Sequence, residues 1–408
     1  MSRRQLLRAV PIAVGAAVLG SAVASRAGWE DGKFAFRLAY GFPAQLLSPD
    51  TDDQRQPAHL IASSTSAFHF EPGSTEIVPT TVQYQDGEQL RQADLDSLLQ
   101  STSTHAFIVT CGETLLYEQY FNGYRRDSVC VSMSMAKSFT SALVGIAIDE
   151  GVITSVNDPI TAYLPELQGR GFDPITIRHL LTMGSGIRFN TVDDGIAYFY
   201  PDLRQLLLTR LSIQEPPGQS FHYNSYNPEL LGLILQRTTQ RTASQYLQDK
   251  IWMPVGMEYP ATWSIDSDED GLELMQSAIN ARAIDYAKFG RLYLNRGNWG
   301  GRQIVSDQWV EQSATRDPLD RRVWENYADW ADSGGYYTNG WWGMPQPDGP
   351  ETYMAVGKYG QYLFISPPTQ VVIVRTAKAW GLDWVVWPRV FQYIADQIGR
   401  RPDVATSI

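Results

Sequence analysis

The chain has too few cysteines for a disulfide framework and no basic surface of the kind that binds nucleic acid. Its 408 residues include two cysteines, Cys111 and Cys130, and the formal net charge is -11, with no basic cluster beyond the extreme N-terminus. An acidic chain without a basic patch is not expected to bind nucleic acid. One cysteine pair is too few for a disulfide scaffold at this length, so a single bridge and two free thiols both stay open.

Several signatures of metal, nucleotide and hydrolase chemistry are also missing. The sequence has no His-Glu-x-x-His, no paired-cysteine zinc spacing, no glycine-rich phosphate loop and no Gly-x-Ser-x-Gly. Five histidines leave a Ser-His-Asp triad open. However, His179 lies in an apparent helix, and His222 is better placed as a neighbour of a site than as its base.

One segment of the chain is a candidate for export or membrane insertion. Arg3 and Arg4 precede an apolar run from Ala9 to Ala24, which ends in the small-residue motif Ala22-Val23-Ala24. This arrangement resembles a bacterial twin-arginine export signal over residues 1–27, and an uncleaved membrane anchor is the alternative. Because the run is short and rich in alanine and glycine, we expect export to the periplasm, with an inner-membrane anchor only if the segment is not cleaved.

Periodicity places strands near both ends of the remaining chain. Residues 105–111 and 114–121 read as two strands joined by a turn, and strand-like runs return at 361–366 and 370–376. The apolar spacing between them is mostly helical, and a last amphipathic helix is expected over 384–399. The sequence thus predicts an α+β fold, in which an antiparallel sheet from both chain ends is flanked by helices and carries an inserted helical lobe.

The same pattern divides the chain into parts. An N-terminal extension rich in proline, serine and aspartate is expected over 28–95, followed by one domain over 96–400. The mostly helical lobe occupies about 150–315 of that domain. A site is expected between the two lobes, where ligand clefts commonly form, and Ser134 lies at their junction.

Ser134 and Lys137 stand three residues apart at the head of a predicted helix. Apolar residues recur at helical spacing after the serine, and Gly151 is placed to end the helix. Positions i and i+3 share one face, which brings the lysine amine within reach of the serine hydroxyl. A serine nucleophile with a lysine base has this geometry. The alternative is an ordinary helix-start serine and a solvated lysine.

A second motif, Phe221-His222-Tyr223-Asn224-Ser225, is followed by Leu230-Leu231-Gly232. With it the chain resembles the class C beta-lactamase superfamily, which includes DD-peptidases, family VIII carboxylesterases and 6-aminohexanoate-dimer hydrolases. The resemblance makes Tyr223 the catalytic tyrosine and places Ser225 where beta-lactamases have asparagine. A tyrosine beside a lysine can share its proton, since the ammonium favours the phenolate. The alternative for Tyr223 is a plain aromatic core position.

A third element, residues 355–360, has the sequence Ala-Val-Gly-Lys-Tyr-Gly. It resembles the Lys-Thr-Gly segment of the family in esterase versions that lack the basic residue. This register makes the backbone N–H groups of Ser134 and Lys358 an oxyanion hole, which acyl transfer requires. The rival register begins the motif at Lys358 and gives a role to its side chain.

The resemblance covers about residues 100–395 and implies a beta-lactamase/transpeptidase-like fold. It implies a serine hydrolase that cleaves a small-molecule ester or linear amide through an acyl-enzyme on Ser134, with Lys137 and Tyr223 relaying protons. No metal or organic cofactor is needed for that chemistry. A DD-peptidase or beta-lactamase is the alternative activity, and a non-catalytic penicillin-recognising binding protein is the alternative class.

Four residues are expected to contact the substrate. Ser225 and Gly357 follow from the motifs, while Trp341 and Trp342 come from an aromatic stretch that can equally serve as core packing. Ala355 supplies no basic side chain to hold the carboxylate of a beta-lactam or peptide, which favours ester or linear-amide substrates.

Overall fold

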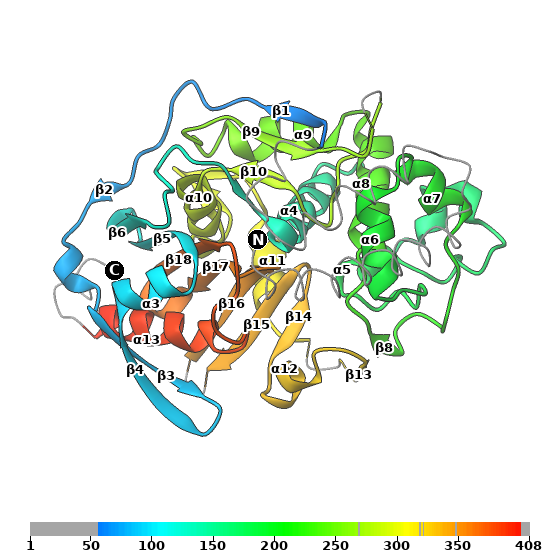
Figure 1. Cartoon of the computed structure of the whole chain (residues 1–408). Helices are drawn as coiled ribbons and strands as arrows, with labels where there is room; N and C mark the ends of the chain where they lie inside the picture. Colours follow the sequence, from blue (N-terminus) through cyan, green and yellow to red (C-terminus); the bar gives the residue numbers. More distant parts are fainter. Residues whose placement is uncertain (1–55, 268–269, 318–319, 321, 347–348, 401–408) are drawn as a thin grey trace, which may run out of the picture.

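The computed structural model describes residues 56–400 with the exception of 268–269, 318–319, 321 and 347–348 (Figure 1). The predicted export signal over 1–27 lies outside the described residues, as does the first part of the extension. Within the described part of the chain, no helix is long and apolar enough to cross a membrane.

An eight-stranded sheet forms the centre of the larger lobe (Figure 1). Its strands run antiparallel to their neighbours, except that β2 lies parallel to β6. The two ends of the chain meet where β5 pairs with β18, with Ile108 opposite Val374. The predicted sheet from both chain ends is therefore confirmed. In spatial order its strands are β14 (Tyr336–Thr338), β15 (Trp341–Gln346), β16 (Gly349–Gly357), β17 (Gln361–Ser366), β18 (Val371–Ala377), β5 (Thr104–Cys111), β6 (Thr114–Tyr120) and β2 (Glu71–Pro72).

One face of this sheet is covered by helices from both ends of the domain. Phe364 and Ile373 belong to the same buried cluster as Phe391 of α13 (Trp387–Gly399) and Leu99 of α3 (Leu95–Ser101). Side chains at alternate positions of a strand point to the same face of the sheet. The apolar side of α13 packs against the large side chains on that face. The hairpin of β3 (Thr81–Asp86) and β4 (Gln89–Asp94) packs beside α13 (Figure 1).

The opposite face is covered by α10 (Ala283–Leu294). Gly290 permits this close approach, because a Cβ atom there would lie 2.6 Å from Val372 and 2.7 Å from Leu363. The predicted helical lobe of about 150–315 includes α10, but in the structure this helix packs on the sheet. Sequence order alone does not show on which lobe a helix packs.

A second, four-stranded sheet leads the chain to Ser134. Its order is β1-β9-β10-β7, formed by β1 (Ala58–Ile61), β9 (Ala261–Ser264), β10 (Ile279–Ala281) and β7 (Cys130–Val131). The described part of the extension therefore contributes β1 to this sheet and β2 to the eight-stranded sheet, and it also forms the β3–β4 hairpin. Cys111 and Cys130 form no disulfide in the structure.

The mostly helical lobe packs against α4 (Ala136–Asp149), which runs between the two lobes (Figure 1). Gly151 follows the end of α4 with φ of +73°, a conformation that favours glycine after a helix. The other helices of the lobe are α5 (Ile177–Leu181), α6 (Thr191–Phe199), α7 (Leu203–Thr209), α8 (Tyr226–Thr239) and α9 (Ala243–Leu247). Short elements complete the fold: β8 (Ser220–Phe221), β11 (Asn298–Trp299), β12 (Arg302–Gln303), α11 (Asp307–Ala314), β13 (Val323–Trp324) and α12 (Ala328–Asp332).

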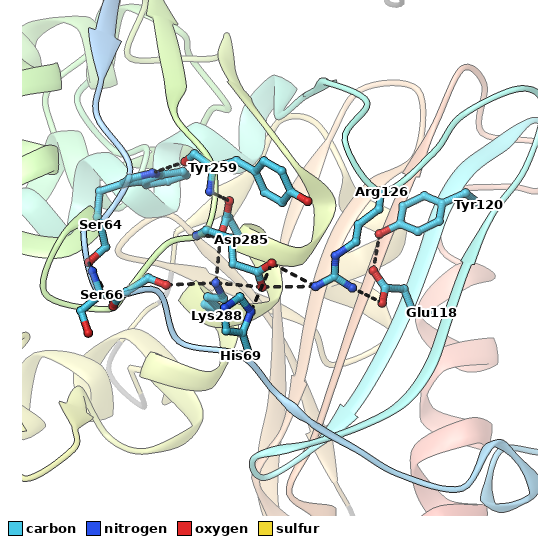
Figure 2. Close-up of polar contacts among 12 residues, drawn as sticks. Ser64, Ser66, His69, Glu118, Tyr120, Arg126, Tyr259, Asp285 and Lys288 are labelled. Atoms are coloured by element: carbon cyan, nitrogen blue, oxygen red, sulfur yellow. Dashed lines mark hydrogen bonds and ion pairs between the residues drawn. The ribbon is translucent and has the colours of Figure 1, made fainter.

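A charged network joins α10 to β6 and to the loop that precedes β9 (Figure 2). Lys288 Nζ lies 3.1 Å from Asp285 Oδ1 and 3.1 Å from Glu258 Oε1. Arg126 donates to Glu258 and to Glu118 of β6. Burial alone would raise the pKa of Glu258, but Lys288 and Arg126 hold it below its ordinary value. Each buried charge here has a partner, as the cost of desolvation requires.

Candidate active site

Ser134 lies in a sharp turn between β7 and α4. The residue before it, Met133, has φ of +44°, which is uncommon for a residue other than glycine. A 3-10 turn over Met133–Met135 then leads into α4. Ser132 anchors the turn, since its backbone N–H donates to Ile279 O at 2.7 Å and its Oγ accepts the Ile279 N–H at 3.0 Å. The strained turn presents the Ser134 hydroxyl at the start of a helix.

Lys137 contacts the serine as its spacing predicts. Its Nζ donates to Ser134 Oγ at 2.9 Å and to the backbone carbonyl of Gln276 at 2.8 Å. The side chain is 3% exposed, and in the described part of the chain no carboxylate oxygen lies within ion-pair distance of Nζ. Burial lowers the pKa of Lys137 to about 8, against the opposing effect of Asp194 and Glu229. A neutral amine, able to accept the serine proton, is therefore well populated near pH 8.

Tyr223 lies over the same pair, in the loop between β8 and α8. The Lys137 Nζ is 4.9 Å from the centre of its ring, and the neighbouring Ser134 side chain acts to lower the pKa of its hydroxyl. Trp342 and Tyr337 pack around the ring at centroid distances of 5.5 and 5.8 Å. Burial raises the pKa of Tyr223 well above its ordinary value, so the resting residue is a neutral phenol that can donate a proton.

The third motif forms the edge of the site. Gly357 ends β16 beside the Ser134 turn, where a Cβ atom would lie 2.5 Å from Ser132 O. Lys358 begins the turn to β17, and its side chain is exposed with Nζ 5.6 Å from the centre of the Tyr359 ring. Buried side chains fix this turn: Arg375 Nη1 donates to Gly360 O at 2.8 Å, and Gln361 Nε2 donates to Lys358 O at 3.2 Å.

A cavity of about 780 Å³ contains the groups from all three motifs. Ser134, Tyr223, Ser225, Gly357 and Lys358 line it, and so does Trp342. The structure thus brings together nearly all of the predicted site residues. The rest of the wall includes four aromatic residues, from both lobes and from the C-terminal segment: Phe189, Tyr327, Trp380 and Trp384.

The Ser225 side chain is engaged by an acid that the sequence did not reveal. Ser225 Oγ donates to Asp194 Oδ1 at 2.6 Å, and both residues line the cavity. Asp194 comes from α6. It places a carboxylate in the cavity wall, which disfavours an acidic substrate group at that position.

The prediction that Trp341 contacts the substrate is wrong. Trp341 is fully buried and packs against Phe289 and Tyr293, at centroid distances of 6.0 and 4.5 Å. Adjacent residues of a strand point to opposite faces of the sheet, so only Trp342 of this pair reaches the cavity. Tyr337 is also core, behind Tyr223.

Sequence reasoning also missed the groups that hold Lys137. Gln276 supplies only a backbone carbonyl, which carries no signature in the sequence. Glu229 lies between the two parts of the second motif, directly before Leu230. That position did not indicate that its carboxylate is buried. Among the described residues, no group of three or more His, Cys, Asp or Glu side chains could hold a metal ion.

Comparison with known proteins places the chain in a family. The Beta-lactamase family model matches residues 94–388. The chain belongs to the beta-lactamase family. It is 29% identical over 306 residues to the 6-aminohexanoate-dimer hydrolase of Paenarthrobacter ureafaciens. The match covers 71% of this chain and 76% of that protein. The predicted membership of this beta-lactamase-related superfamily is therefore confirmed, and the chain is a hydrolase of that family.

Two solved structures share the fold of this chain. A 6-aminohexanoate-dimer hydrolase candidate from Bacillus anthracis superposes with a TM-score of 0.77 at 24% identity, covering 92% of this chain and 97% of that one. A family VIII carboxylesterase superposes with a TM-score of 0.56 at 15% identity, over 73% of this chain and 92% of the other. The beta-lactamase/transpeptidase-like fold is thus confirmed.

Proposed function

We propose that this beta-lactamase-family hydrolase cleaves esters or linear amides through an acyl-enzyme on Ser134. The observation that carries the proposal is the 2.9 Å contact between Lys137 Nζ and Ser134 Oγ, made by a buried lysine whose pKa is about 8. A serine hydroxyl needs an adjacent base to act as a nucleophile near neutral pH.

In the proposed first step the Ser134 oxygen attacks the substrate carbonyl carbon while its proton moves to the neutral amine of Lys137. The backbone N–H groups of Ser134 and Lys358 donate to the oxyanion that forms. Tyr223 then protonates the departing alkoxide or amine, and its own proton is restored from Lys137. Water attacks the acyl carbon in the second step, with the same pair taking its proton and returning one to Ser134.

The cavity favours apolar ester or amide substrates over beta-lactams. Tyr327, Trp380 and Trp384 offer aromatic surface for an apolar group. Ala355 is buried and supplies no cation for a substrate carboxylate, and Asp194 would repel one. The relative that hydrolyses 6-aminohexanoate dimers supports a linear amide as one candidate substrate.

The substrate class is tested with the purified protein and a panel of short-chain p-nitrophenyl esters, linear amides, D-peptides and nitrocefin. We expect ester or linear-amide turnover that is lost in Ser134→Ala, with nitrocefin turnover at least 100-fold slower. Rapid nitrocefin hydrolysis or a stable penicillin adduct would identify the beta-lactamase or DD-peptidase alternative. Turnover by Ser134→Ala equal to that of the wild type would contradict the proposed function.

We further propose that the protein is exported by the twin-arginine route, on the strength of Arg3 and Arg4 before a short apolar run. Changing both arginines to lysine is expected to retain the protein in the cytoplasm. Fractionation of cells that express the wild type and the Arg3→Lys/Arg4→Lys variant checks this. Unchanged fractionation would contradict it.

A further inference from the structure

Glu229 is a buried carboxylate that the proposed chemistry leaves unused. It lies on α8, six residues after Tyr223, and its side chain is 1% exposed. Its Oε1 accepts the backbone N–H of Gln276 at 3.1 Å, and its Oε2 accepts that of Met275 at 3.1 Å. A charged group buried to this degree needs such partners, because desolvation is costly.

The Met275–Gln276 segment that Glu229 holds is also the segment that contacts α4. The carbonyl of Gln276 accepts from Lys137 Nζ at 2.8 Å. One turn along α4, Thr140 Oγ1 donates to the carbonyl of Met275 at 3.2 Å. The segment is therefore fixed by the Glu229 carboxylate from α8 and by two side chains from α4. Among the described residues Lys137 has two hydrogen-bond acceptors, and this segment supplies one of them.

We propose that Glu229 is a positioning residue for Lys137: it fixes the backbone carbonyl that orients the lysine amine toward Ser134, and it supplies a buried negative charge nearby. The inference rests on the proposed function, in which Lys137 is the base. Glu229 acts through the peptide backbone and through its field, since Lys137 is not among its hydrogen-bond partners.

The charges around the pair set the direction of the effect. Burial raises the pKa of Glu229 to about 8, while the two backbone N–H groups and Lys137 oppose that rise and Asp266 adds to it. Lys137 is faced by Asp194 from α6 and by Glu229 from α8, besides Ser134 and Tyr223. Two N–H donors on one carboxylate favour its ionised form. The carboxylate is ionised near and above pH 8, which is also the range in which Lys137 titrates, so removing its negative charge there makes the Lys137 ammonium less stable.

The variant Glu229→Gln removes both functions of the carboxylate at nearly constant volume. A glutamine oxygen can accept one backbone N–H, but its amide group then meets the other N–H as a donor. The matched control is Glu273→Gln. Glu273 is also a buried carboxylate of this region and accepts the Ser244 N–H at 2.9 Å, but it bonds His59 instead of the segment that Lys137 contacts.

The test measures the rate of Ser134 labelling by a fluorophosphonate probe from pH 5 to 10 in the wild type and both variants. For Glu229→Gln we expect the acid limb to move down by about half a pH unit or more, because a negative charge near Lys137 is lost. The maximal rate should fall roughly 10- to 100-fold through misplacement of the base. Glu273→Gln should leave the limb where it is in the wild type.

The outcomes separate this inference from the proposed function. An unlabelled wild type overturns both. A labelled wild type, together with an unmoved acid limb in Glu229→Gln, overturns the role of Glu229 alone. If Glu229→Gln does not fold, the Glu229→Gln/Lys137→Met double variant decides: regained folding supports the coupling of the two residues, and a double variant that also fails to fold contradicts it.

Discussion

Two buried lysines of this protein, Lys137 and Lys288, have opposite surroundings. Lys288, on α10, is fully buried and lies 3.1 Å from each of two carboxylates, Asp285 and Glu258. Figure 2 shows Lys288 beside Asp285. Lys137, on α4, is 3% exposed and contacts a serine hydroxyl and a backbone carbonyl instead. Lys288 forms ion pairs that hold α10 to neighbouring segments. Lys137 is an ammonium that loses its proton more readily than an ordinary lysine.

The difference lies in how the charge is compensated. Direct contact with carboxylates stabilises the ammonium form and suits a structural role. Among the described residues, only the more distant Asp194 and Glu229 supply negative charge near Lys137, and burial brings its pKa down to about 8. Its position beside a cavity then makes that proton available to chemistry. A buried lysine without a contacting carboxylate is therefore the better guide to the site in this molecule.

The largest expected effect is on turnover. Lys137→Met removes the proposed base and should lower kcat/KM for a p-nitrophenyl ester about 10³-fold, within the range of general-base catalysis. That loss corresponds to about 4 kcal/mol of activation free energy. Circular dichroism of the variant checks that the fold is retained. A folded Lys137→Met protein that keeps more than about a tenth of wild-type turnover would show that another group is the base.

The matching change in the charged network should act on stability instead. Lys288→Met leaves Asp285 and Glu258 buried beside each other without their shared cation, which should lower the free energy of unfolding by about 3 kcal/mol or more. Chemical denaturation of the two variants measures the contrast. Lys137→Met is expected to lose less stability than Lys288→Met, and the reverse order would break the comparison.

The pH dependence sharpens the same contrast. Because the neutral amine of Lys137 is the active form, kcat/KM should rise with pH through about 8 and be lost as pH falls below that value. The pKa of Tyr223 is raised well above its ordinary value, so its ionisation should not end activity until strongly alkaline pH. Profiles in which the acid limb lies near pH 6 would point to a histidine, and His222 in the cavity wall would be the first to test.

The smallest effect is expected at Lys358. Its side chain is exposed and lies along Tyr359, and only its backbone N–H is assigned a role. Lys358→Ala should keep kcat/KM within about threefold of the wild type, because the substitution leaves the backbone N–H that is assigned to the oxyanion in place. Steady-state kinetics on the same ester provide the measurement. Near-complete loss of turnover in a folded protein would favour the rival register, in which the side chain acts.

Local spacing predicted one contact at the centre of the candidate site. Ser134 and Lys137 meet because positions i and i+3 of a helix start share one face, and the contact at 2.9 Å follows from that geometry. Tyr223 was predicted from the resemblance of its motif to a known family. The sheet from both chain ends was likewise visible as strand-like runs near residues 105–121 and 361–376.

Contacts between distant segments could not be read in the same way. Lys137 and Gln276 are 139 residues apart, and Glu229 and Gln276 are 47 apart, so these hydrogen bonds exist only in the folded chain. The alternation of a strand predicts that one of Trp341 and Trp342 faces the cavity, but which one depends on the packing of the sheet. Which buried groups lie next to each other depends on the tertiary structure, and the periodicity of the sequence does not predict such contacts.

The central claim is that Ser134 is the nucleophile and Lys137 its base. Incubation of the wild type, Ser134→Ala and Lys137→Met with a fluorophosphonate, followed by peptide mass mapping, measures this. The account predicts a single adduct on Ser134 in the wild type, none on that peptide in Ser134→Ala, and labelling about 10³-fold slower in Lys137→Met. An adduct on another residue, or equal labelling rates in the wild type and Lys137→Met, would contradict it.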